Sequence, residues 1–183
     1  FLVGCKLNPH NNSTENLPSE STQSGGVILD NAGYKRIKAD QVTHISEIQG
    51  AGHISPLNRK VVDNVFGVVT ALKSDGFYIQ SVYPDTDLRT SEAIYIFLNA
   101  IPSIRSGDWV LVNGKIDEFY PGGLGSGNLS ITEITQADVL IVSRGNQLPS
   151  ATILGMEGRS IPNRIIDDDK KKKFELTDGL DFY

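Results

Sequence analysis

The 183-residue sequence has very little cysteine and histidine, and this limits its chemistry. Cys5 is the only cysteine, so no internal disulfide and no zinc site built from several cysteines can form. The three histidines, His10, His44 and His53, are too scattered to predict a metal cluster. None is paired with a serine, cysteine or carboxylate in a pattern typical of nucleophilic catalysis. We therefore expect no catalytic site in this chain.

A basic surplus and a long apolar run are also missing. The sequence has 17 Lys and Arg against 22 Asp and Glu, a net charge of −5. Neutralising phosphates requires excess positive charge, so this balance argues against strong sequence-independent nucleic-acid binding and leaves room only for weak or local contact. No apolar run approaches the roughly 18–20 residues of a membrane span. With 39% hydrophobic and 21% charged residues, the chain can still form a packed core.

The N-terminal stretch 1–26 differs in composition from the rest. After residue 5 it is dominated by small polar residues, and it holds too few large apolar side chains to offset the entropy of ordering, so we predict a disordered tether. Residues 2–5 (LVGC) resemble the lipobox of bacterial lipoproteins, in which the cysteine is lipidated; this makes Cys5 a candidate lipidation site and a possible membrane anchor. The alternative is a chance fragment of a buried segment. Because residue 1 is Phe and not Met, we expect a processed product or a fragment.

Five runs rich in β-branched and aromatic residues follow, and no helical periodicity longer than a turn or two lies between them. Gly67 and Gly114 interrupt the first and fourth runs, and mid-strand glycines favour a bulge or bend. The pattern predicts a mainly β chain whose five strands close into a small barrel over 61–145, with an irregular lead-in at 27–60 that packs on it and an irregular extension at 146–183. The predicted strands are 61–72, 77–82, 93–98, 108–119 and 128–142, the last with a break.

Several motifs, in order, resemble the OB-fold module of large secreted bacterial nucleases. They are 45–50 (ISEIQG), 55–57 (SPL), 67–70 (GVVT), 76–80 (GFYIQ), 90–94 (TSEAI), 107–110 (GDWV) and 114–119 (GKIDEF), followed by 161–169 (IPNRIIDDD) and 178–183 (DGLDFY).

This resemblance, which spans about 43–183, implies a five-stranded OB-fold-like Greek-key barrel. It also implies an extracellular or cell-surface protein with a downstream catalytic domain of the endonuclease/exonuclease/phosphatase type, which would use a divalent cation such as Mg²⁺, Mn²⁺ or Ca²⁺. None of that domain's motifs is present here, so no catalytic role is carried over to any residue and no cofactor is expected in this chain.

Strand alternation divides the second and third strands into two faces. If Phe77, Ile79, Ile94 and Ile96 fill the barrel, the intervening side chains point outward. On OB-folds this outer face is where bases stack on aromatic rings. The alternative is that these aromatics pack beneath a neighbouring segment or the downstream domain. The candidate nucleic-acid-binding residues are Tyr78, Gln80, Tyr95 and Phe97, with Lys73, Arg89 and Lys115 as local positive charges.

Two acidic segments have features of ion sites. Asp85, Asp87 and Glu92 have the spacing of a loose Ca²⁺ site but lack its full ligand set, which favours a solvated loop. The block 167–173 (DDDKKKK) could hold a metal or a polyanion, but its adjacent opposite charges favour a hydrated linker.

The leading hypothesis is a non-catalytic module that guides single- or double-stranded nucleic acid to the downstream domain. Its rivals are a structural spacer that docks the catalytic domain, and an oligosaccharide- or protein-binding OB-fold lipoprotein.

Overall fold

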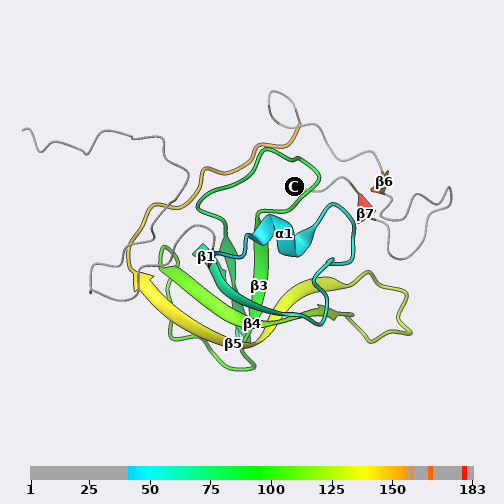
Figure 1. Cartoon of the computed structure of the whole chain (residues 1–183), viewed down its shortest axis with the longest axis horizontal. Coiled ribbons are helices and arrows are strands. Elements are labelled where there is room, and N and C mark those ends of the chain that lie inside the picture. Colours follow the sequence, from blue (N-terminus) through cyan, green and yellow to red (C-terminus); the bar gives the residue numbers. More distant parts are fainter. Residues whose placement is uncertain (1–40, 156–157, 159–164, 167–178, 181–183) are drawn as a thin grey trace, which may run out of the picture.

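The computed structural model describes residues 41–155, 158, 165–166 and 179–180. The predicted tether at 1–26, its Cys5 and the block 167–173 lie outside these residues. Over its described residues, the structure contains no helix with the length and hydrophobicity that a membrane span requires. The elements are α1 (Ile45–Gln49), β1 (Val61–Leu72), β2 (Gly76–Gln80), β3 (Ala93–Phe97), β4 (Trp109–Phe119), β5 (Ile131–Ser143), β6 (Ile165–Ile166) and β7 (Gly179–Leu180) (Figure 1).

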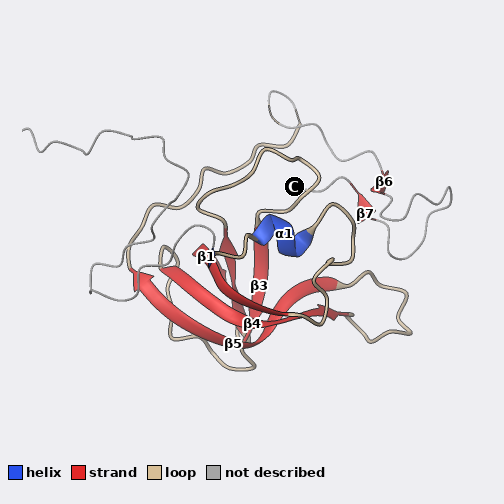
Figure 2. Ribbon diagram, in the orientation of Figure 1, coloured by secondary structure: helices blue, strands red, loops and turns tan. Residues whose placement is uncertain are grey.

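The first five strands form one sheet that closes on itself in the order β1-β2-β3-β5-β4 (Figure 2). The long strand β1 pairs with β4 from Val61 to Val68 and with β2 from Val68 to Leu72, so a single bent strand serves two neighbours. The pairing of β3 with β5 is parallel, and the other pairings in the barrel are antiparallel. The predicted mainly β, OB-fold-like barrel of five strands is confirmed.

Alternation along the strands places one set of side chains inside the barrel. Phe77, Ile79 and Ile96 are fully buried and Ile94 is 2% exposed, so the predicted inner face is confirmed. They pack with apolar residues from β1, β4 and β5, and α1 adds two isoleucines to the same core. Burying such side chains stabilises the fold by about 1.5–3 kcal/mol each. The other members of this core are Ile45, Ile48, Val62, Val65, Val69, Ile104, Val110, Val112, Ile116 and Ile134.

The two mid-strand glycines mark places where backbones approach closely. At Gly114 the β4–β5 register shifts between Asn113 and Lys115, and a Cβ atom there would collide with the Ile134 side chain. On β5, Gln136 has a φ of 51° in the same region, which accounts for the predicted break in an otherwise continuous strand. A Cβ at Gly67 would lie 2.9 Å from the carbonyl oxygen of Gln80, at the bend where β1 passes from β4 to β2.

Candidate functional site

A row of side chains crosses the outer face of the barrel. Tyr78 on β2 is the cross-strand partner of Tyr95 on β3, and Tyr95 is in register with Glu133 on β5. Glu133 is in turn the partner of Asp117 on β4. Four neighbouring strands therefore bring two aromatic rings and two carboxyl groups together on one surface.

Tyr95 is the central residue of this row, and its side chain is largely covered. Only 4% of it is exposed, because the ring centroid lies 4.8 Å from that of Tyr78 and 4.7 Å from the ammonium nitrogen of Lys73. The Tyr95 hydroxyl donates a hydrogen bond to Asp75 Oδ1 at 2.5 Å. Burial and this hydrogen bond to a carboxylate raise the pKa of Tyr95 far above its usual value. Tyr95 is therefore fixed in place as a neutral hydrogen-bond donor.

The turn between β1 and β2, residues 73–75, lies close to Tyr95 on the outer face of the barrel. This close approach requires a glycine at position 76, the first residue of β2. A Cβ atom at Gly76 would lie 2.6 Å from the Tyr95 hydroxyl and would collide with the backbone carbonyl of Ile96. Glycine thus permits Lys73 and Asp75 to reach Tyr95. The hydrogen bond from Tyr95 also lowers the pKa of Asp75, which keeps that carboxyl ionised.

The predicted nucleic-acid-binding residues are brought together only in part. Tyr78, Tyr95 and Lys73 form one contact group, and Gln80 follows on the same face of β2, partly exposed. Phe97 lines a neighbouring pocket.

The other two predicted cations lie apart from this group. Arg89 sits in the loop before β3 and pairs with Asp87 at 2.6 Å. Lys115 is on β4, opposite Thr135, and β5 separates it from β3. The local positive charge at the aromatic pair therefore comes from Lys73.

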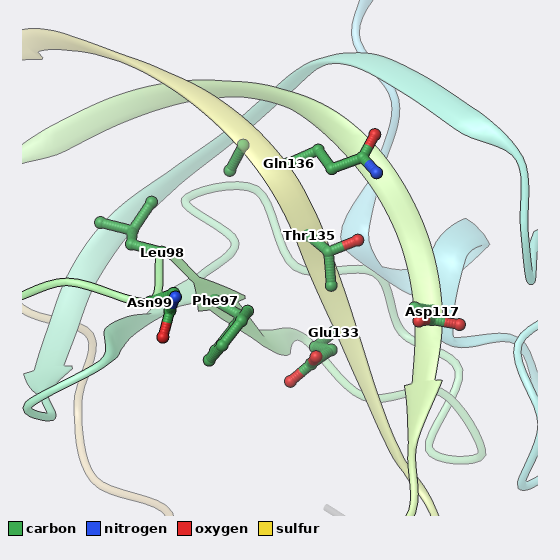
Figure 3. Close-up of a pocket in the computed structure, with 8 residues that line it drawn as sticks. Phe97, Leu98, Asn99, Asp117, Glu133, Thr135 and Gln136 are labelled. Carbon is green, nitrogen blue, oxygen red and sulfur yellow. The ribbon is translucent and has the colours of Figure 1, made fainter.

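The pocket beside the aromatic pair has a volume of about 440 Å³ and lies between the end of β3 and the middle of β5 (Figure 3). Glu133 is 7% exposed, and its carboxyl group forms no hydrogen bond or ion pair with the described part of the chain. Burial, and then the nearby negative charges of Asp117 and Asp75, raise its pKa to about 7. The lining residues are Phe97, Leu98, Asn99, Asp117, Glu133, Thr135, Gln136 and Ala137.

The acidic loop before β3 uses its carboxylates to hold its own backbone. Asp85 accepts a hydrogen bond from the Asp87 N–H at 2.7 Å, and Glu92 accepts one from the Asp85 N–H at 2.8 Å. Asp87 binds the Arg89 guanidinium, which lowers the pKa of Asp87 to about 2. Within the described ranges, no three His, Cys, Asp or Glu side chains are grouped so that they could hold a metal ion.

A second polar cluster, which sequence reasoning missed, lies at the other end of β4. Glu118 is buried and accepts hydrogen bonds from the Ser55 N–H at 2.9 Å, the Thr132 hydroxyl at 2.9 Å and the Ser130 hydroxyl at 2.6 Å. The Ser130 hydroxyl oxygen also lies 3.3 Å from His53 Nε2. His53 therefore has a serine neighbour, Ser130, and the Glu118 carboxylate bonds to that serine.

This cluster still lacks the arrangement of a catalytic triad. In a triad the acid binds the histidine and the histidine binds the serine, whereas here Glu118 binds Ser130 directly. The carboxylate joins the lead-in loop, through Ser55, to the start of β5. Its geometry is that of a structural anchor.

Comparison with protein families, with curated proteins and with solved structures finds no match to this chain.

Proposed function

We propose that this chain is a non-catalytic module that binds single-stranded nucleic acid on the outer face of β2 and β3. The observation that carries the proposal is the pair of tilted rings of Tyr78 and Tyr95 on this face, whose centroids lie 4.8 Å apart. The partly exposed Tyr78 is the accessible ring, and Lys73 lies beside the pair. Aromatic platforms of this kind bind bases by stacking, at about 1–3 kcal/mol per base.

The wider setting of the proposal follows from the resemblance of the motifs to secreted bacterial nucleases. In that setting the barrel guides DNA or RNA to a downstream catalytic domain that uses a divalent cation. The protein acts outside the cell, with Cys5 as the residue that would carry a lipid anchor. Binding is expected to be weak, because Asp75, Asp117 and Glu133 lie close to the aromatic pair and repel phosphate.

The test is a fluorescence anisotropy titration of a labelled oligothymidylate, begun at low ionic strength. Tyr78→Ala should weaken binding by about 1–3 kcal/mol without unfolding the protein. Tyr83→Ala is the matched control, because Tyr83 is 64% exposed and lies against Phe66, away from this face. Equal binding by the two variants and the unmodified chain would refute the proposal, as would the absence of any binding.

One observation favours a second function, that of a structural spacer. Tyr95 is only 4% exposed and its hydroxyl is engaged by Asp75, so this ring already serves packing. If the whole face is structural, Tyr95→Ala should lower the free energy of unfolding by about 3–5 kcal/mol, and Tyr78→Ala should lower it as well while leaving oligonucleotide binding unaffected.

A further inference from the structure

Glu133 occupies an unusual position for a carboxyl group. It is more than nine-tenths buried, it lines the pocket, and it has no hydrogen-bond or ion-pair partner among the described residues. Its carboxyl oxygens are not among the fully buried side-chain atoms that lack a partner, so they reach solvent in the pocket. A carboxyl group with a buried stem and oxygens open to a pocket can accept hydrogen bonds from a ligand held there.

The surroundings of Glu133 restrict the chemistry of that ligand. Negative charge comes from Asp117 and Glu118 on β4 and from Asp75 in the β1–β2 turn, whereas Lys73 is the positive group that acts on it. On β3 the neutral Tyr95 faces it. This excess of negative charge disfavours a phosphate and favours a group that donates hydrogen bonds.

The pocket also offers an aromatic surface beside the carboxyl group. Phe97, from the end of β3, and Glu133 line the same pocket, and Figure 3 shows both side chains together with those of Asn99, Asp117 and Thr135. A planar ligand can stack on a phenylalanine ring while its edge meets an acceptor. A cavity of about 440 Å³ is within the size range of small-ligand sites.

We propose that this pocket is a base-recognition subsite that selects guanine in a single strand. The inference rests on the proposed nucleic-acid function and adds to it a base preference. The Watson–Crick edge of guanine presents two adjacent donors, N1–H and the exocyclic amino group, which match the two oxygens of an ionised Glu133. Adenine and cytosine present a donor beside an acceptor, and thymine presents a single donor between two acceptors. A carboxylate pairs fully with guanine alone.

The protonation state of Glu133 makes the preference depend on pH. The two-donor edge requires the ionised carboxylate, and the pKa of Glu133 in the free protein is raised to about 7 by burial and by Asp117 and Asp75. The preference for guanine should therefore increase as the pH rises from about 6 to about 8, a range in which guanine keeps its N1 proton.

The experiment compares oligothymidylates that carry one central guanine, one central hypoxanthine or no substitution, titrated into the full chain by fluorescence anisotropy. Hypoxanthine lacks only the exocyclic amino group. The guanine strand should bind roughly 5- to 50-fold more tightly than the hypoxanthine strand at about pH 8. Glu133→Gln, which is nearly isosteric, should abolish this difference and its pH dependence. Asp138→Asn removes the same charge from an exposed position of β5 and should keep both.

The outcomes separate the two proposals. If all strands bind equally, and Tyr78→Ala weakens them equally, the guanine subsite is refuted and the nucleic-acid function stands. If no strand binds, both are refuted. A guanine preference that survives in Glu133→Gln would place recognition elsewhere on the protein and would also overturn the inference. Thermal melting of each variant confirms that the comparison is made between folded proteins.

Discussion

The buried carboxylate of Glu118 provides the sharpest test of how the lead-in loop is held to the barrel. Replacing it by alanine leaves three donors without their acceptor: the Ser55 N–H and the hydroxyls of Ser130 and Thr132. All three residues are buried, with exposed fractions of 4%, 7% and 8%. A hydrogen bond to a charged group contributes about 1.5–3 kcal/mol. Since hydroxyls can rotate to new acceptors, we take the lower end and expect Glu118→Ala to lower the free energy of unfolding by about 3–5 kcal/mol.

The measurement is urea denaturation followed by tryptophan fluorescence, with the m-value checked for two-state behaviour. Glu118→Gln keeps one acceptor oxygen and should cost about 1–2 kcal/mol. Asp138→Asn is the control, because Asp138 is an exposed carboxylate on β5, so its effect should stay within about 0.5 kcal/mol. If Glu118→Ala is no more destabilising than Asp138→Asn, the anchoring role derived from these hydrogen bonds is wrong.

Three other outcomes follow from the outer face. Gly76→Ala should destabilise the fold by about 1–3 kcal/mol, because its Cβ would collide with the β3 backbone, whereas Gly125→Ala, with nothing within 4 Å of its Cβ, should be neutral in the same denaturation assay. The raised pKa of Glu133 means that the folded state binds more protons than the unfolded state between about pH 4.5 and about pH 7, so unmodified protein should lose stability as the pH rises through this window. In thermal melts recorded across this pH range, Glu133→Gln should remove the loss of stability, which is up to about 3 kcal/mol. A stability difference between the two proteins that does not change with pH would contradict this prediction. Tyr95→Phe should bring the pKa of Asp75 back toward its ordinary value, as followed by NMR titration; an unchanged pKa would show that the hydroxyl is not its cause.

The barrel could be predicted from the sequence because its signals are local. Alternating apolar residues in β2 and β3 identify the inner face, and the turn before Gly76 separates β2 from β1. The short helix α1 was not predicted, because five residues are too few to show helical periodicity. Its two isoleucines belong to the core only because the barrel offers them a place to pack.

The polar features of the candidate site depend on contacts between distant residues and could not be predicted. Glu118 and Ser55 are 63 residues apart, so nothing near either one indicates the hydrogen bond between them. Glu133 stands in a strand among threonines and isoleucines and resembles an ordinary solvent-facing acid; its burial arises from the parallel approach of β3. Tyr95 was expected on the outer face, but its covering by the β1–β2 turn depends on the absence of a side chain at Gly76.

The parallel contact between β3 and β5 is the narrowest join in the barrel. It consists of two residue pairs, Tyr95 with Glu133 and Ile96 with Ile134, whereas β4 and β5 remain paired from Trp109 to Phe119. This seam is where the ring should open first in local fluctuations, measurable as the fastest hydrogen exchange among the barrel strands. The pocket spans the seam, with Phe97 on one edge and Glu133 on the other. A molecule that contacts both edges would bind the closed ring and stabilise it against opening. The more tightly such a molecule binds, the more rarely β3 and β5 should separate.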